Sequence, residues 1–389
     1  MRVLFFTETA YKKSETFIKN QINNPNLFDK IIITHEVVEK SFDENKVKSV
    51  YNINSIPLTF NDRILSFISR NLNRTKKYSL PYSSLNQLES IIKNEKVSLI
   101  HCNYGNNAIK IIALAKKLNI PTITHFHGYD SSQLLKDITY ASLIKRVFKD
   151  TDATITVSQN MTNRLAEVGL ELKKNHIIPY GTDLSLFNHK SKIKEDSHKL
   201  RILHAGRLTE KKGVLDLTKI LIQIKQENRD LDFTYDIIGD GEEFLSIKKL
   251  VSEHKCEAWI KMHGSVDHTM VIDKMQDCDI FILNSRVSST GDMEGFPNTI
   301  IESMAAKCAV ISTYHAGIPE AIDNNVNGVL VEEKSNEQLK QAILSVITDD
   351  SFRNKLKEQA FIKATNSFSI QQMYSKYYEL YKEVSQQKK

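Results

Sequence analysis

Short apolar runs alternate with amphipathic stretches along the whole chain, and this alternation predicts the fold. Each run is rich in β-branched residues and is followed by a segment with helical periodicity. The runs are nearly continuous in apolar character, as is typical of parallel strands covered by helices on both faces. We therefore predict an α/β protein with two parallel sheets. The runs are RVLFF, KIIIT, SLIHCNY, PTITHFHG, ATITVS and HIIPYG in the first half, then LRILHAG, FTYDIIGDG, KMHGS, IFILNS, AVISTY and GVLVEE.

One polar stretch separates the two sets of strands. Residues 188–199, NHKSKIKEDSHK, lack apolar periodicity and are expected to form a linker. This places a first domain at 1–187 and a second domain at 200–365. The segment 366–389 after them has a helical apolar face, which we expect to cross back to the first domain. That face carries Met373, Tyr377, Leu380, Tyr381 and Val384.

Composition adds limits on the class of protein. A chain of 389 residues is too long for one ordinary core, which agrees with two domains. No apolar run approaches the length of a membrane span, and the N-terminal stretch meets Glu8 too early for a secretory signal, so a cytoplasmic protein is expected. The four cysteines are widely spaced and predict neither a zinc site nor disulfides. The net charge of +6 is mild and uninformative by itself, and no nucleic-acid partner is expected.

Basic residues concentrate in one segment, DRILSFISRNLNRTKK, residues 62–77. Its apolar residues recur at helical spacing, and Arg63, Arg70, Arg74, Lys76 and Lys77 occupy the remaining positions and the end. A basic amphipathic helix can lie on an anionic membrane surface, which would give peripheral contact with the cytoplasmic membrane. An ordinary surface helix that packs on its own domain explains the pattern equally, so both interpretations stand.

Candidate chemistry lies in the loops that follow the strands, because open parallel sheets bind ligands at the carboxyl ends of their strands. The loop HAGRLTEKKG contains Arg207 and Lys212. The planar guanidinium of arginine and the compact ammonium of lysine together suit a diphosphate. In GDMEGFPNTIIES, Pro297 is expected to start a helix whose free N–H groups favour a phosphate. Glu294 and Glu302 would repel that phosphate, so they are expected to accept hydrogen bonds from hydroxyls beside it.

Two other motifs also follow predicted strands. IIGDGEEF has two glycines after a strand, but the third glycine of a dinucleotide fingerprint falls at Phe244, so that interpretation is rejected. THFHGYD places His125 and His127 two positions apart, which we take to point to opposite sides of the strand and to make a poor metal pair. His127 alone can bond a substrate hydroxyl or move a proton, and a buried structural histidine is the competing interpretation.

GRLTEKKG, the Glu-x7-Glu pattern of EGFPNTIIES, and AVISTYHAGIPEAIDNNVNGVLV together resemble the retaining GT-B glycosyltransferases of family 4, also called group 1. ETAYKKSETFIKNQI, HFHGYD and IPYGTDLSLF resemble the branch that builds bacterial surface polysaccharides of the colanic acid, amylovoran, O-antigen and capsule types. The resemblance covers nearly the whole chain. It implies two facing Rossmann-like domains, with the acceptor bound by the first, the nucleotide-sugar bound by the second, and the active site in the cleft between them.

The resemblance also implies roles for individual residues. The donor diphosphate would be held by Arg207, Lys212 and backbone amides at the helix start, while Glu294 contacts the sugar and Glu302 the ribose. His127 would approach the donor sugar from the other domain. Many relatives have a second glycine where this chain has Pro297, which donates no N–H. The remaining implied positions are Gly295, Phe296, Asn298 and Thr299 for the diphosphate, Gly264 and Val266 for the base, and Gly105, Asn106, Tyr129 and Asp130 on the acceptor side.

The implied activity is that of a retaining hexosyltransferase that needs neither metal nor cofactor. It would move a hexose or N-acetylhexosamine from a UDP-sugar, or alternatively from GDP-mannose, to a hydroxyl of a glycan on a polyprenyl diphosphate. Two alternatives stay open. A GT-B nucleotide-sugar 2-epimerase would share the fold and act without an acceptor. A two-lobed solute-binding protein would also close on a polyol, although it would have no use for Arg207 and Lys212.

Overall fold

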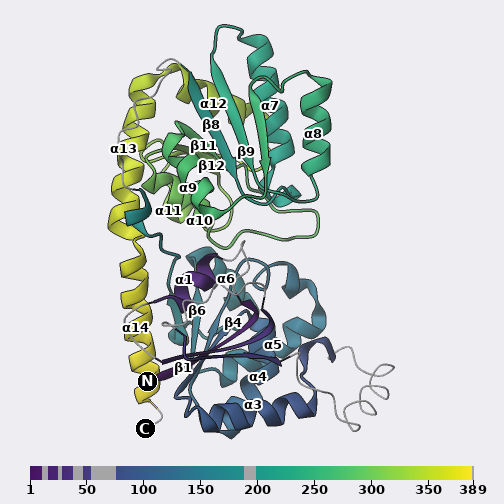
Figure 1. Cartoon of the computed structure of the whole chain (residues 1–389), viewed down its shortest axis with the longest axis vertical. Coiled ribbons are helices and arrows are strands. Elements are labelled where there is room, and N and C mark those ends of the chain that lie inside the picture. Colours follow the sequence, from purple (N-terminus) through teal and green to yellow (C-terminus); the bar gives the residue numbers. More distant parts are fainter. Residues whose placement is uncertain (11–15, 25–28, 38–46, 54–75, 188–198, 388–389) are drawn as a thin grey trace. The chain divides into compact units, whose positions relative to one another are not determined.

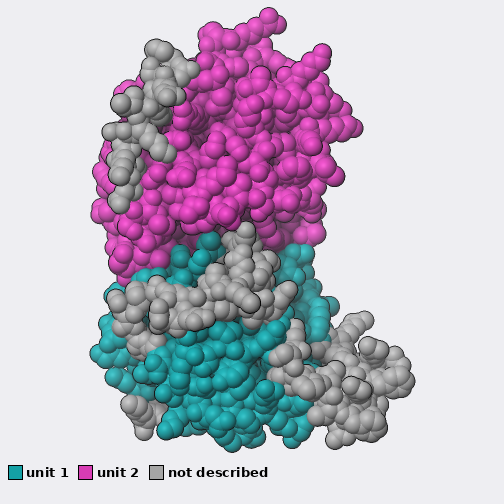
Figure 2. All heavy atoms as spheres, in the orientation of Figure 1, with its two compact units in different colours: residues 1–179, 373–389 teal, residues 180–372 magenta. Residues whose placement is uncertain are grey.

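The computed structural model divides into two compact units. It describes residues 1–10, 16–24, 29–37, 47–53, 76–187 and 199–387. The first unit comprises Met1–Pro179 together with Met373–Lys389, and the second comprises Tyr180–Gln372 (Figure 2). The expected end of the first domain at 187 therefore differs from the unit boundary by eight residues. Those residues belong to the second unit, where Thr182 forms a parallel bridge with Ser369.

The first unit is built on a seven-stranded sheet in the order β3-β2-β1-β4-β5-β6-β7, and its neighbouring strands pair in parallel. Strands β1, β4 and β6 of this sheet are labelled in Figure 1. The edge strand β3 was missed from the sequence, because its four residues are only half-buried and show no continuous apolar run. The strands are β1 Arg2–Ala10, β2 Asp29–Val37, β3 Ser49–Asn52, β4 Leu99–Asn103, β5 Thr122–His125, β6 Ala153–Thr156 and β7 Asn175–Ile177.

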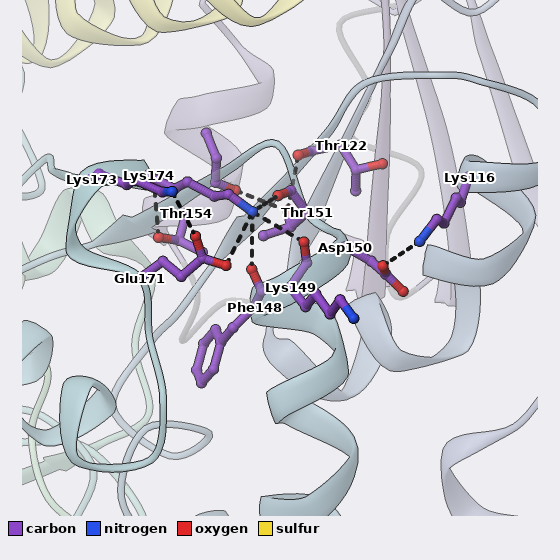
Figure 3. Close-up of polar contacts among 11 residues, drawn as sticks. Lys116, Thr122, Phe148, Lys149, Asp150, Thr151, Thr154, Glu171, Lys173 and Lys174 are labelled. Carbon is purple, nitrogen blue, oxygen red and sulfur yellow. Dashed lines mark hydrogen bonds and ion pairs between the residues drawn. The ribbon is translucent and has the colours of Figure 1, made fainter.

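Helices follow the strands of this sheet, and α5 illustrates how their ends are satisfied. The Asp137 carboxylate accepts from the backbone N–H groups of Thr139 and Tyr140 and caps its start. At its end, Lys174 donates to the carbonyls of Phe148, Lys149 and Thr151 (Figure 3). A cation there also complements the helix dipole. The helices are α1 Thr16–Ile22, α3 Tyr82–Asn94, α4 Gly105–Lys117, α5 Ile138–Asp150 and α6 Gln159–Glu167.

The last helix, α14 (Ile370–Gln386), belongs to the first unit from Met373 onward. The Tyr374 hydroxyl donates to the carbonyl of Asn20, and the Tyr381 hydroxyl lies 2.6 Å from Nδ1 of His101. Helical spacing places the apolar side chains of α14 on one face, and that face is buried. Its buried residues include Met373, Tyr377, Leu380, Tyr381 and Val384.

The second unit is built on a six-stranded parallel sheet in the order β10-β9-β8-β11-β12-β13. The order runs outward in both directions from the β8–β11 pair, as in a doubly wound fold. All six strands were expected from the apolar runs. They are β8 Leu200–Ala205, β9 Phe233–Ile238, β10 Ile260–Gly264, β11 Ile280–Ile282, β12 Ala309–Thr313 and β13 Val329–Val331.

Helices α7 and α8 pack side by side on this sheet (Figure 1). Their apolar faces and that of α12 enter one continuous core with the strands, which includes Ile202, Leu221 and Ile343. Near-continuous burial of the central strands explains why they lack polar alternation. The helices are α7 Val214–Glu227, α8 Phe244–Glu253, α9 His268–Asp277, α10 Asn298–Ala305, α11 Ile318–Ala321, α12 Asn336–Thr348 and α13 Asp350–Ser367.

Two predictions fall largely outside the described residues. The linker at 188–199 is described only at Lys199, and the basic segment 62–77 only at its last two residues. Those two begin the short 3-10 helix η2 (Lys76–Tyr78), where Lys77 forms an ion pair with Asp137. None of the described helices is long and apolar enough to cross a bilayer. All four cysteines are described, and they are buried and free.

Candidate functional site

The loops that follow β8 and β11 start at the point where the strand order of the second sheet reverses. This position favours ligand binding, because the two loops diverge at the carboxyl edge of the sheet. The first loop, residues 206–213, contains the 3-10 helix η6 (Glu210–Lys212), and the second, residues 283–297, leads to α10. Both candidate motifs of the second half therefore come from neighbouring strands.

Gly213 lets the two loops approach each other. Its φ of 61° lies in the left-handed region, and a Cβ there would come within 2.2 Å of the Asn284 carbonyl oxygen. The Asn284 side chain in turn donates to the Gly213 carbonyl at 3.2 Å. The glycine at this position is therefore required both by the backbone conformation and by the close contact.

Three consecutive side chains of η6 bind successive parts of the second loop. The Glu210 carboxylate accepts from the backbone N–H and the hydroxyl of Ser289. Lys211 pairs with Asp292 at 2.8 Å, and Lys212 pairs with Glu294 at 3.0 Å. The loops are thus joined by a row of polar contacts. Sequence reasoning found Lys212 and Glu294 but not that they contact each other.

Lys212 and Glu294 form a buried ion pair, with each residue 8% exposed. Burial alone would raise the pKa of Glu294, but the positive charges of Lys212 and Lys211 lower it to about 2. Burial lowers the pKa of Lys212, and the Glu294 carboxylate opposes that effect. The pair therefore keeps a carboxylate charged inside the protein, beside a cation that can also meet an anionic ligand.

The start of α10 differs slightly from the prediction. Pro297 was expected to be the first helical residue, but it is the N-cap, with an extended ψ of 116°, and the helix begins at Asn298. Proline before the first turn loses no helical hydrogen bond, so either position is tolerated. The Thr299 hydroxyl is buried and has no hydrogen-bond partner among the described residues. Phe296 packs on Phe368, 5.4 Å between ring centroids, and Gly295 is buried between it and Glu294.

The remaining predicted donor residues of this unit lie around the same region. Glu302 lies in the second turn of α10, and its Oε1 is 3.0 Å from Nε2 of His268 at the start of α9. Gly264 ends β10 with a φ of 67°, and Val266 follows it half-buried. His268 was not singled out from the sequence, because a lone histidine carries no signal there.

Arg207 is exposed, and within the described part of the chain its guanidinium pairs with no carboxylate. The two glycines of IIGDGEEF, Gly239 and Gly241, lie against the backbone of the Arg207 loop. A Cβ at Gly239 would lie 1.8 Å from the Gly206 carbonyl oxygen. The backbone N–H of Leu208 donates to the Asp240 carbonyl at 2.9 Å, so this turn supports the Arg207 loop.

In the first unit, His127 follows β5 and is 2% exposed. Its Nε2 lies 3.1 Å from Oδ1 of Asn103, and its ring packs on Tyr104 and Phe17. Burial, with a smaller effect of His101, lowers the pKa of His127 well below its usual value. The imidazole is therefore neutral near pH 7, which suits hydrogen bonding to a hydroxyl.

The expected arrangement of His125 and His127 was wrong. Their ring centroids lie 4.4 Å apart, because residues two positions apart in an extended chain share one side. His125 and His101 lie 5.5 Å apart in the same buried cluster. Among the residues that the structure describes, no three His, Cys, Asp or Glu side chains are grouped so that they could hold a metal ion.

Asp130 connects the predicted acceptor-side residue Gly105 to His127. It is fully buried and accepts from the backbone N–H groups of Gly105 and His127, each at 2.7 Å. Burial raises the pKa of Asp130 to about 7, although those two amides lower it. Asn106, in the first turn of α4, is half-buried, and Tyr129 is 47% exposed.

Besides Glu210 and Lys211, sequence reasoning missed two residues that contact the second loop from the ends of β12 and β13. The His315 imidazole, which is fully buried after β12, accepts from the backbone N–H of Glu294 at 3.0 Å through Nε2. Its Nδ1 lies 2.6 Å from Oε1 of Glu333, which follows β13. Both residues stand at strand ends in the quoted segment AVISTYHAGIPEAIDNNVNGVLV and the residues after it, and that position was the available signal.

Comparison with protein families gives two matches that together cover most of the chain. Residues 187–363 match the model described as glycosyl transferases group 1. Residues 32–186 match the model described as glycosyltransferase family 4. The two matches meet near the boundary between the compact units.

Several relatives are named for bacterial polysaccharide biosynthesis. A colanic acid biosynthesis glycosyltransferase of Salmonella typhimurium is 32% identical over 56% of this chain and 52% of its own length. An amylovoran biosynthesis glycosyltransferase of Erwinia amylovora is 30% identical over 64% of this chain and 60% of its own. The aligned part thus spans little more than half the length of these relatives.

Solved structures share the fold over nearly the whole chain. Anabaena HepE in complex with UDP-glucose superimposes with a TM-score of 0.77 at 18% identity, covering 99% of this chain and 100% of that one. Sucrose-phosphate synthase from Thermosynechococcus elongatus superimposes with a TM-score of 0.77 at 17% sequence identity, covering 98% of this chain and 98% of that one. The predicted α/β class, with two Rossmann-like parallel-sheet domains of the GT-B type, is confirmed. With both halves matched by its models, the chain belongs to the group 1, family 4 glycosyltransferases.

Proposed function

We propose that this protein is a retaining, metal-independent glycosyltransferase that uses a nucleotide diphosphate sugar. The observation that carries the proposal is the buried Lys212–Glu294 ion pair at the strand-order reversal, directly before the start of α10. A cation, a helix N-terminus and an exposed Arg207 supply positive charge for a diphosphate. The adjacent carboxylate of Glu294 supplies an acceptor for sugar hydroxyls.

Transfer in this proposal needs no covalent intermediate. The acceptor oxygen attacks the anomeric carbon from the face that the diphosphate leaves, and the bond between that carbon and the diphosphate oxygen breaks. The acceptor proton passes to the departing diphosphate, so the products are a nucleoside diphosphate and a new glycoside. Arg207, Lys212 and the backbone amides at Gly295, Phe296, Asn298 and Thr299 stabilise the charge that develops on the leaving group.

Further residues take supporting roles in this proposal. Glu302 accepts from the ribose hydroxyls, and backbone groups around Gly264 and Val266 contact the base. His127 bonds a donor-sugar hydroxyl as a neutral imidazole, and Gly105, Asn106, Tyr129 and Asp130 belong to the acceptor side. Two observations support this role of His127. Its lowered pKa keeps the imidazole neutral, and its backbone N–H donates to the Asp130 carboxylate.

A UDP-sugar with a hexose or N-acetylhexosamine is the proposed donor, and GDP-mannose is the second choice. The UDP and UDP-glucose complexes of Anabaena HepE support a uridine nucleotide in a protein of the same fold. The proposed acceptor is a hydroxyl of a polyprenyl-diphosphate-linked glycan at the cytoplasmic membrane surface. The colanic acid and amylovoran names of the relatives support a role in surface polysaccharide synthesis.

The test is a transfer assay with a panel of UDP- and GDP-sugars in EDTA, with and without a polyprenyl-diphosphate glycan. The proposal predicts acceptor-dependent release of one nucleoside diphosphate, and a product that keeps the anomeric configuration of the donor by NMR. An inverted product would refute the retaining mechanism, and a requirement for added metal would refute metal independence. Conversion of the donor sugar without any acceptor would instead establish the 2-epimerase alternative. Family membership leaves the solute-binding alternative without support.

A further inference from the structure

The loop that carries Glu294 is held at two points by one pair of side chains from neighbouring strand ends. Glu333 accepts from the backbone N–H of Val287 at 2.8 Å through Oε2. Its other oxygen lies 2.6 Å from Nδ1 of His315, whose Nε2 accepts from the backbone N–H of Glu294 at 3.0 Å. The two ends of the segment 287–294 are therefore tied to the same carboxylate, directly at one end and through the imidazole at the other.

The chemistry of these contacts determines the state of the ring. A backbone N–H can only donate, so Nε2 of His315 must present its lone pair to Glu294. The ring proton is then on Nδ1, where it donates to Glu333. The carboxylate thus selects the tautomer that can accept from the loop, as a hydrogen-bonded partner does for a metal-bound histidine. The imidazole of His315 is fully buried, whereas the side chain of its partner Glu333 is 26% exposed.

Topology explains why these three elements meet. β11, β12 and β13 are adjacent parallel strands, and the loop at 283–297, His315 and Glu333 follow their respective ends. On the opposite side of the loop, η6 makes its own contacts through Glu210, Lys211 and Lys212. The side chain of Glu294 is thus fixed by Lys212, whereas its backbone is fixed by His315.

We propose that His315 and Glu333 are positioning residues for sugar transfer, which set the backbone at Glu294 and the amides that follow it. Neither side chain needs to touch the substrate. The inference rests on the proposed function for its effect on catalysis, because Glu294 and the amides from Gly295 onward act on the donor only in that proposal. The contacts themselves belong to the free protein and are testable without any donor.

The first measurement is hydrogen exchange of the Glu294 backbone amide, followed by NMR in the unaltered protein and in His315→Leu. Loss of the acceptor is expected to speed exchange of this amide by about five- to tenfold. His315→Gln places an amide oxygen near the position of Nε2 and is expected to restore most of the protection. The matched control is His254→Leu, which replaces an exposed histidine at the end of α8.

The second measurement is donor turnover by the same variants. His315→Leu is expected to lower kcat about 10²-fold, because a small displacement of a catalytic group has an effect of this size. The donor KM should change less, and His315→Gln should recover kcat to within a few-fold. Glu333→Gln keeps only one of the two acceptor oxygens, so its kcat should lie between those of His315→Leu and His315→Gln. The control is Glu332→Gln at the neighbouring exposed position, whose kcat should match that of the unaltered protein.

The two measurements separate failure of this inference from failure of the proposed function. Unchanged exchange of the Glu294 amide in His315→Leu would overturn the proposed contact between His315 and Glu294, whatever the activity of the protein. Faster exchange with unchanged kcat would overturn the positioning role. If the unaltered protein transfers no sugar from any donor, the proposed function is overturned, and with it the catalytic role of His315 and Glu333. The exchange measurement would still decide whether His315 holds the Glu294 amide. Should His315→Leu fail to fold, His315→Gln and Glu333→Gln carry both measurements.

Discussion

The two units present buried carboxylates in opposite electrostatic states. In the second unit, burial would raise the pKa of Glu294, but Lys212 and Lys211 lower it to about 2. In the first unit, burial raises the pKa of Asp130 to about 7, and two backbone amides only partly oppose it. Near pH 7 the carboxyl group is thus kept charged in one unit and is about half protonated in the other.

The difference follows from the partners that each fold supplies. The loops after β8 and β11 bring lysines to Glu294, whereas the Asp130 carboxylate accepts from the backbone N–H groups of Gly105 and His127. A site with buried lysines suits a diphosphate, and a site with a partly protonated carboxyl suits sugar hydroxyls. The contrast therefore agrees with donor binding in the second unit and hydroxyl recognition in the first. Breaking each site should have a different signature.

The largest effect is expected for Lys212→Ala, which removes the cation from the charged site. The activity loss should correspond to about 2 to 4 kcal/mol of transition-state stabilisation, if Lys212 contacts the leaving group. The variant should also unfold more easily, because Glu294 is left buried without its partner. Turnover and thermal unfolding measure the two effects, and full turnover with every donor would refute the role of Lys212.

A double variant separates binding from folding at this pair. Lys212→Met with Glu294→Gln removes both charges, so unfolding should return close to that of the unaltered protein, while donor turnover stays lost. Lys219→Ala serves as the control for lysine removal, because Lys219 is an exposed residue of α7. Recovery of turnover in the double variant would show that the single variant failed by misfolding alone.

The next effect concerns the neutral histidine of the first unit. His127→Asn should lower kcat about 10²-fold, because it moves a hydrogen-bonding group away from the sugar. Affinity for the free nucleoside diphosphate should stay unchanged, since that ligand lacks the sugar. Steady-state kinetics and calorimetry give the two values. Equal loss of nucleotide affinity would argue that His127 acts through the fold of the protein.

Asp130 gives a smaller, pH-dependent effect on stability. Its pKa rises on folding from about 3.8 to about 7, so the folded protein binds the proton more tightly than the unfolded chain. This carboxyl therefore destabilises the fold progressively as pH rises through that window, and the effect levels off above about pH 7. Asp130→Asn removes this dependence.

The stability of Asp130→Asn relative to the unaltered protein should accordingly improve by about 2 kcal/mol between pH 5 and pH 7. Urea unfolding at the two pH values measures the change. The comparison within each protein cancels the loss of one acceptor oxygen, because that loss is present at both pH values. An unchanged relative stability between pH 5 and pH 7 would mean that Asp130 is already charged in the folded protein at pH 5.

The smallest effect is expected for Tyr381→Phe in α14. The hydroxyl lies 2.6 Å from Nδ1 of the buried His101, so its removal should cost about 1 kcal/mol of unfolding free energy. Kinetic constants should remain unchanged, because neither residue belongs to the proposed sites. Tyr378→Phe, which replaces another tyrosine of the same helix, provides the comparison. A loss of kcat in Tyr381→Phe would indicate that α14 influences the active groups.

Much of this arrangement was predictable, because local patterns determine strands and the ends of strands. The loops with Lys212 and Glu294 were expected to lie near each other, since both follow parallel strands of one sheet. The partners of those side chains were not predictable, because Lys211–Asp292 and Glu333–His315 join residues far apart in the chain. Such pairs depend on loop conformation and side-chain packing, which leave no periodic signal.

The errors have equally local causes. β3 was missed because a short, half-buried edge strand lacks the apolar run that marks the central strands. His125 and His127 were assigned to opposite sides, although side chains two positions apart in a strand share one side. Pro297 was placed one residue too far into α10, since proline is tolerated at both positions.

The central claim is that the second unit binds a nucleoside diphosphate through the Lys212–Glu294 site without metal. Calorimetric titration of UDP, GDP and ADP in EDTA tests it, on the unaltered protein and on the Lys212→Met, Glu294→Gln double variant. We predict saturable binding of one nucleoside diphosphate, and UDP is the nucleotide we expect. This binding should be lost in the double variant while the fold is retained. Binding of none of the three, or equal binding by both proteins, would contradict the account.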